Sequence, residues 1–203
     1  TVPVVEWMRR WAPVLRRQGR SDAGKPAVTP YTQRATELLQ QAAGIVPRET
    51  LGQGTGPLAA RAAYLRRVLS PRLRLHDNLI EVHPRATIER VFGPEVARRA
   101  RHGADTRVWA TRKQVLVGLV EGIAFDYVWP ELVVRNPHMF HAVICAFTAF
   151  LWARQGYRGP TDLEGSEPAR VSPDALHQAI EAFGTLWLED GWVFVPPASA
   201  RRR

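Results

Sequence analysis

A single clear β-strand pattern, set among helical patterns, constrains the fold of this chain more than any other feature of its sequence. Leu79–His83 is short, apolar and β-branched, and it lies between the turn residues Asp77-Asn78 and Pro84, which are typical boundaries of a strand. One strand makes no sheet, and even a two-stranded ribbon is only marginally stable in water. An α/β fold therefore needs further strands beside Leu79–His83.

Weaker strand patterns occur at two other places. Glu189-Asp190-Gly191 separates the apolar segments Thr185–Leu188 and Trp192–Val195, which predicts a hairpin. Glu131–Arg135 is ambiguous and fits a strand. Because these strands are few, either further strands escape the pattern or the sheet is completed by strands that this chain does not contain.

The other regular patterns are helical, since apolar residues recur at intervals of three and four. The most apolar of these segments is Pro137–Gln155, which we expect to be the buried helix. Ser172 is a candidate N-cap for the last helix. The predicted helices are Val4–Gln18, Tyr31–Ala43, Leu58–Leu69, Arg85–Phe92, Pro94–Arg101, Thr111–Phe125, Pro137–Gln155 and Pro173–Phe183.

Composition is that of a globular protein, with 203 residues of which 45% are hydrophobic and 23% charged. We expect one domain over residues 1–197 and a basic tail over residues 198–203. The single cysteine, Cys145, excludes a disulfide within the chain and argues against a cysteine-based zinc site. No apolar run reaches about 18 residues and no signal-peptide pattern opens the chain. We therefore expect a cytoplasmic protein with no membrane segment.

The chain is strongly basic, with a formal net charge of +9. Its cations are almost all arginine, since Lys25 and Lys113 are the only lysines. The planar guanidinium group suits phosphate, and a basic surface attracts nucleic acid or another polyanion. The alternative is that these arginines serve only as solvated surface cations.

Two groups of cations are candidate nucleic-acid ligands. Arg98, Arg99 and Arg101 form a basic run that could follow a phosphate backbone. Arg112 and Lys113 lie near Trp109, a mixture of cations and an aromatic ring that suits stacking on a single strand. A solvated helix face and a tryptophan packed in the core are the respective alternatives.

Three segments, in this order, resemble one protein family. They are Leu79–Pro84, a strand that carries a carboxylate and ends at a proline, Phe140–Ala149, a late apolar helix, and Asp190–Pro196, a closing strand. Upstream, Tyr31–Glu37 is similar to that family's Arg-x-Thr-Asp helix, with Glu37 in place of the aspartate. The pattern resembles the domain-of-unknown-function family numbered 429, which is described as a predicted RNase H-like nuclease.

The resemblance implies an α/β fold, an RNase H-like mixed sheet flanked by helices, with this chain richer in helix. It also implies acids from strands and one late helix that converge on divalent metal, Mg²⁺ or Mn²⁺, to cleave a phosphodiester. The family opens with strands that carry its first catalytic aspartate, and this chain begins near the helix that follows them. We therefore expect an N-terminal segment or a protein partner to complete the sheet.

Glu81 and two histidines are the candidate site residues. Glu81 and His83 share one face of the strand, and His138 and His141 share one face of the late helix. In an RNase H-like fold these groups would approach one metal ion, with Glu81 and His141 catalytic and Glu81, His141 and His138 as ligands. The alternatives are a carboxylate paired with an arginine and histidines that serve the core.

Three functions are therefore open. The first is a metal-dependent nuclease with an altered or degenerate active site. The second is a non-catalytic module that binds nucleic acid, and the third is a structural subunit completed by a partner chain.

Overall fold

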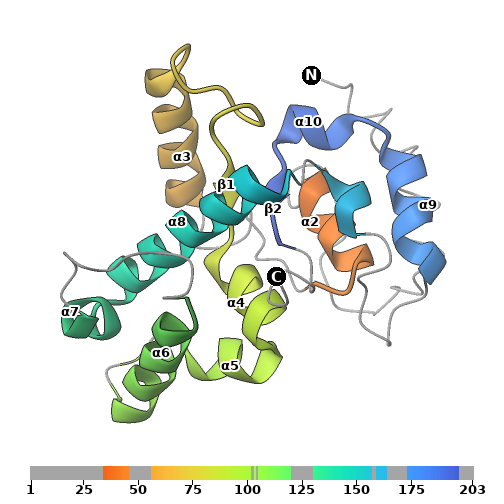
Figure 1. The fold of residues 1–203 in the computed structure, drawn as a ribbon. Helices are drawn as coiled ribbons and strands as arrows, with labels where there is room; N and C mark the ends of the chain where they lie inside the picture. The colour runs from red at the N-terminus through yellow and green to blue at the C-terminus, as the bar shows by residue number, and fades with distance from the viewer. Residues whose placement is uncertain are drawn as a thin grey trace. The chain divides into compact units, whose positions relative to one another are not determined.

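The computed structural model describes residues 34–45, 56–101, 103, 105–119, 130–156, 159–163 and 173–196. These residues are rich in helix and contain one small parallel sheet of two strands, an α/β arrangement at a coarse level (Figure 1). The predicted helix Val4–Gln18, the Ser172 cap and the tail over residues 198–203 lie outside the described residues.

The chain divides into two compact units, and each is described by itself. Unit 1 comprises residues 1–81 and 159–193, and unit 2 comprises residues 82–158 and 194–203. The two strands, β1 (Glu81–Val82) and β2 (Val193–Phe194), pair with each other, and the division falls within both. The single domain expected over residues 1–197 stays a prediction, because two compact units can belong to one domain.

Unit 1 is built around α2 (Ala35–Ala42), which packs against α9 (Pro173–Phe183) and α10 (Leu186–Asp190) (Figure 1). The short 3₁₀ helix η1 (Pro160–Leu163) contacts α9. Helix α3 (Gly56–Leu69) also belongs to this unit. The apolar faces of α2, α9 and α10 form a core of Ala35, Leu38, Leu39, Ala42, Leu176, Ala179, Phe183 and Leu186.

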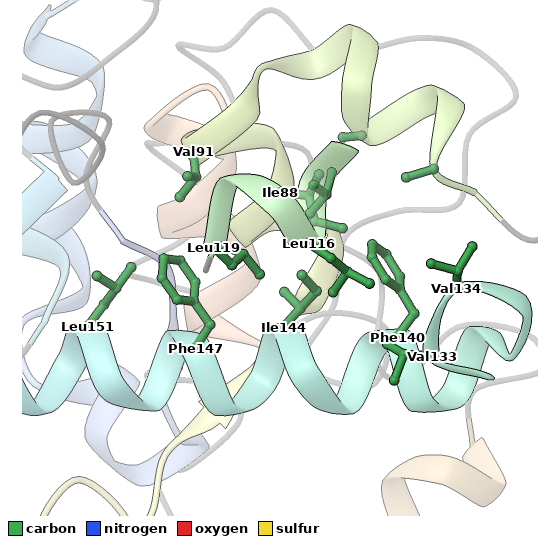
Figure 2. Packing of buried hydrophobic residues seen from close by; sticks show 13 residues of the cluster. Ile88, Val91, Leu116, Leu119, Val133, Val134, Phe140, Ile144, Phe147 and Leu151 are labelled. Carbon is green, nitrogen blue, oxygen red and sulfur yellow. The ribbon is translucent and has the colours of Figure 1, made fainter. Parts of the chain in front are cut away.

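Unit 2 contains five described helices. They are α4 (Pro84–Phe92), α5 (Pro94–Arg99), α6 (Thr106–Leu119), α7 (Pro130–Arg135) and α8 (Pro137–Gln155). Figure 2 shows Phe140, Ile144, Phe147 and Leu151 along one side of α8, facing apolar side chains of α4 and α6. Their spacing of three and four residues gives α8 one buried stripe.

The ends of α8 explain why its bounds match the prediction. Pro137 occupies the first turn, where its missing N–H costs no helical hydrogen bond. The side chain of Asn136 accepts hydrogen bonds from the backbone N–H groups of His138 and Met139. Gly156, with φ +72°, ends the helix in the left-handed conformation that favours glycine.

Two strand predictions are wrong. Glu131–Arg135 lies in helix α7, where Pro130 begins the helix and Glu131 pairs with Arg135 one turn later. The predicted hairpin of Thr185–Leu188 and Trp192–Val195 does not form, because residues from Leu186 to Asp190 are helical. The strand β2 pairs instead with β1, far away in the sequence.

Other predicted elements differ only at their ends. The strand predicted over Leu79–His83 is reduced to Glu81–Val82 in β1. Helix α6 starts at Thr106, earlier than the predicted Thr111, because Asp105 accepts a hydrogen bond from the backbone N–H of Arg107. Residues 120–129, which include the predicted end of that helix, lie outside the described residues.

No described helix combines the length and apolar character that crossing a bilayer requires.

Candidate functional site

Glu81 in β1 is held by a bidentate ion pair in unit 1. Arg34 Nη1 donates to Glu81 Oε2 at 2.9 Å, and Arg34 Nη2 donates to Glu81 Oε1 at 2.7 Å. The Glu81 side chain is 36% exposed and that of Arg34 only 15%. Glu81 is therefore a carboxylate at the surface of unit 1 whose two oxygens are both occupied by one guanidinium group.

Arg34 connects this carboxylate to a second one. Its Nε lies 3.3 Å from Glu37 Oε1, and the Glu37 side chain accepts from the backbone N–H of Arg34 at 3.3 Å, which caps α2. Burial alone would lower the pKa of Arg34, but the hydrogen bonds and charges of Glu81 and Glu37 raise it overall. Arg34 therefore stays charged, and a metal ion at Glu81 would have to compete with it.

Helix α2 also holds the strand β2 in place through side-chain hydrogen bonds. Val193 N–H donates to Thr36 Oγ1 at 2.9 Å, and Gln40 Nε2 donates to Val193 O at 2.7 Å. Thr36 and Gln40 are both buried, so they satisfy a peptide group that would otherwise lack partners inside the unit. The segments around residues 34, 81 and 193 thus meet in unit 1.

His76 is a histidine near this cluster that the sequence analysis did not single out. Its Nε2 lies 3.5 Å from Trp192 N, and its ring meets the ring of Trp187 edge-on at 5.9 Å. Burial lowers the pKa of His76. The backbone φ of His76 is +69°, a conformation common only for glycine, asparagine and a few other residues. No short-range sequence signal places His76 beside Trp192.

The two candidate histidines lie on α8, in unit 2. His138 is exposed in the first turn, and His141 is half-buried, with its ring centre 5.9 Å from that of Phe140. Glu81 belongs to unit 1. Within the described segments, no group of three or more His, Cys, Asp or Glu side chains is placed to hold a metal ion. The metal site of Glu81, His138 and His141 stays a prediction.

The predicted basic run is exposed on unit 2. Arg98 and Arg99 lie at the end of α5 and share one carboxylate, Glu95, with N–O distances of 2.7–2.9 Å. Hydrogen bonding from Arg98, more than any other contact, lowers the pKa of Glu95. Arg101 follows α5, and Lys113 lies on α6, both exposed. The run therefore presents more cations than its one shared carboxylate neutralises.

Arg112, by contrast, is 0% exposed and serves the interior of unit 2. Its guanidinium donates to three backbone carbonyls, Ala100 O at 3.2 Å, Arg101 O at 2.9 Å and Val134 O at 3.0 Å. Burial lowers its pKa. The guanidinium of Arg112 is therefore not part of the exposed surface of α6.

Trp109 is also largely used for packing. It is half-buried against the core of unit 2 and its indole Nε1 is buried without a hydrogen-bond partner. Arg135 lies over its ring, 5.0 Å from the ring centre. The alternative of a packed tryptophan thus describes this side chain better than an open stacking platform does.

Comparison with known proteins finds no relative. No protein-family model matches the chain, no curated protein matches, and no solved structure matches. The resemblance to the predicted nuclease family accordingly stays a hypothesis carried by the residues quoted above.

Proposed function

We propose that this protein binds nucleic acid through the exposed cations of α5, of α6 and of the segment between them. The observation that supports the proposal is an excess of positive charge over residues 94–113. The exposed cations there outnumber the two carboxylates, Glu95 and Asp105. We name these cations the basic segment: Arg98, Arg99, Arg101, Arg107 and Lys113.

Both acids of this region are already engaged. Glu95 is shared between Arg98 and Arg99, and Asp105 accepts hydrogen bonds from the Arg107 N–H and the Thr106 hydroxyl at the start of α6. Exposed pairs such as those of Glu95 contribute little to stability, because water screens them. Phosphate groups can therefore displace the single shared carboxylate at small cost, and release of their counterions would drive the association.

The buried side chain of Arg112 gives this surface a fixed support. It donates to the carbonyls of Ala100, Arg101 and Val134. These bonds attach the backbone that directly follows α5 both to α6 and to the backbone at Val134. A backbone that is already held in place loses less conformational entropy on binding than a loose loop. The backbone that carries Arg101 is thus ordered before nucleic acid binds.

A matched pair of charge variants tests the proposal. Arg98→Gln/Arg99→Gln/Arg101→Gln removes three exposed cations from the basic segment, and Arg61→Gln/Arg66→Gln/Arg67→Gln removes three exposed cations from α3. Fluorescence anisotropy with labelled single-stranded and duplex oligonucleotides, across a salt series, should show weaker binding and a flatter salt slope for the first variant. Equal losses in both variants would mean that net charge alone attracts the oligonucleotide, against the proposal.

Cleavage is the second candidate function, and the resemblance of the Glu81 and Phe140–Ala149 segments favours it. The same oligonucleotides, incubated with Mn²⁺, distinguish the two functions. Cleavage that is lost in Glu81→Gln would support an RNase H-like nuclease. Salt-dependent binding without cleavage would support the non-catalytic module.

A further inference from the structure

Helix α3 has an apolar stripe that no described helix covers. Its residues from Pro57 onward are exposed wherever the side chain is described, and no described helix or strand packs extensively on it. Leu58 is 63% exposed and Leu65 44%. Leaving large apolar side chains in water forgoes stabilisation, so the stripe is a surface to be explained.

The spacing of the stripe is that of a helix–helix seam. Leu58, Ala62, Leu65 and Leu69 follow one another at intervals of four, three and four residues, the repeat of the two core positions of a coiled coil. At 3.6 residues per turn these four residues fall within an arc of about 60°. Val68 and Tyr64, which are 58% and 46% exposed, extend the apolar face beyond the stripe on one side. The spacing of the stripe itself is that of a helix–helix seam, which favours a partner helix.

The charges beside the stripe define the partner. Arg61 and Arg66 lie on its two sides, and Arg67 lies behind them. Tyr64 lies between two of these guanidinium groups, 5.6 Å from Arg61 and 5.8 Å from Arg67. The sequence between Glu49 and Asp77 holds five arginines and no acid. A second copy of α3 would place arginine against arginine, which disfavours self-association.

The helix is also suited to binding because it does not depend on a core of its own. Most of Gly56–Leu69 is alanine, leucine and arginine, the residues with the highest helix propensities. Isolated helices of about this length are nevertheless marginal in water. A partner helix that covers the stripe would therefore stabilise α3 while it binds.

We propose that α3 docks an acidic amphipathic helix of another protein, with apolar side chains against Leu58, Leu65 and Leu69 and carboxylates beside Arg61 and Arg66. The partner's leucine-type residues would fill the gaps along the stripe, and its flanking glutamates would pair with the arginines on both sides. This partner is separate from the nucleic acid proposed for the basic segment.

The test uses the full chain and a synthetic helical peptide with leucine at the seam positions and glutamate at the flanking positions. A second peptide has lysine in place of each glutamate. Isothermal titration calorimetry should show that the glutamate peptide binds and that the lysine peptide does not. Leu58→Gln/Leu65→Gln should weaken that binding at least about tenfold, and Arg61→Gln/Arg66→Gln should weaken it and reduce its salt dependence.

The matched control is Val117→Gln in α6, since Val117 is also 63% exposed and lies in unit 2. This variant should bind the peptide as the unaltered protein does. Far-ultraviolet circular dichroism should be the same for all variants, because the substituted side chains are exposed.

Four results would overturn the proposal. They are absence of peptide binding, binding that the leucine variant leaves unchanged, binding to phosphatidylserine vesicles in place of the peptide, and dimerisation that the leucine variant abolishes. Loss of oligonucleotide binding in the basic-segment variant, with peptide binding retained, would show that the basic segment and α3 bind their partners independently.

Discussion

Replacing Arg112 with methionine should destabilise unit 2 more than any surface substitution. Methionine has nearly the same length and fills the same space, but it donates no hydrogen bond. The change therefore removes the three bonds to Ala100 O, Arg101 O and Val134 O and leaves buried acceptors without a donor. It also removes the contact between the guanidinium and the ring of Phe140, 5.5 Å away.

The size of the effect follows from these bonds. A hydrogen bond from a charged donor contributes about 1.5–3 kcal/mol, and a buried acceptor left unpaired costs about 1–3 kcal/mol. Removing a buried charge also removes its desolvation cost, which offsets part of the loss. We expect a net loss of about 3–5 kcal/mol, similar to the cost of breaking a buried ion pair. Total stabilities are only about 5–15 kcal/mol.

Urea denaturation followed by circular dichroism measures this free energy of unfolding. Lys113→Met is the matched control, because Lys113 is the next residue of α6 and is exposed, and it should change stability by about 0.5 kcal/mol or less. Arg112→Lys keeps the charge but cannot reach three carbonyls in one plane, so it should also be destabilising. A loss below about 1 kcal/mol for Arg112→Met would refute the reasoning.

Two further outcomes are expected in unit 1. Gln40→Leu leaves the buried carbonyl of Val193 unpaired and should lower the free energy of unfolding by about 1–3 kcal/mol, whereas Gln114→Leu, an exposed control on α6, should leave it nearly unchanged. Because burial lowers the pKa of His76 below its ordinary value of 6.5, the unfolded chain binds this proton more readily, so stability should fall as pH decreases from 6.5 toward the folded-state pKa. His76→Asn, which tolerates the positive φ, should weaken that dependence in urea titrations at a series of pH values; an unchanged dependence would contradict the assignment.

The helices were predictable because residues close in the sequence determine where each helix begins and ends. Pro137–Gln155 and Pro173–Phe183 match α8 and α9 residue for residue, since proline and a glycine with positive φ act within one turn of the chain. Leu58–Leu69 matches α3 apart from its first two residues. Periodicity over many residues reinforces these signals.

The short elements were not predictable in the same way. Short segments such as Glu131–Arg135 and Thr185–Leu188 fit a strand or a buried helix equally well. Their state depends on what packs against them. The strand β2 pairs with β1 and not with its sequence neighbours, a long-range choice that no local pattern carries.

The candidate site residues likewise include some whose environment follows from the local sequence and others whose environment depends on distant residues. The exposure of Arg98, Arg99 and Arg101 followed from their place in the sequence, whereas nothing local separates buried Arg112 from exposed Lys113 except the helical phase of α6. The partner of Glu81 was equally hidden, because a lone sequence does not say which of many arginines reaches a given carboxylate. Arg34 does so across 47 positions.

The way α2 holds Val193 restricts how the two-stranded sheet can grow. In a strand, the N–H and C=O of one residue point toward the same neighbour, and for Val193 both are taken by Thr36 and Gln40. An incoming strand would find no donor or acceptor there, so β-augmentation is blocked on that side of β2. A polypeptide that enlarges this sheet must add beside β1.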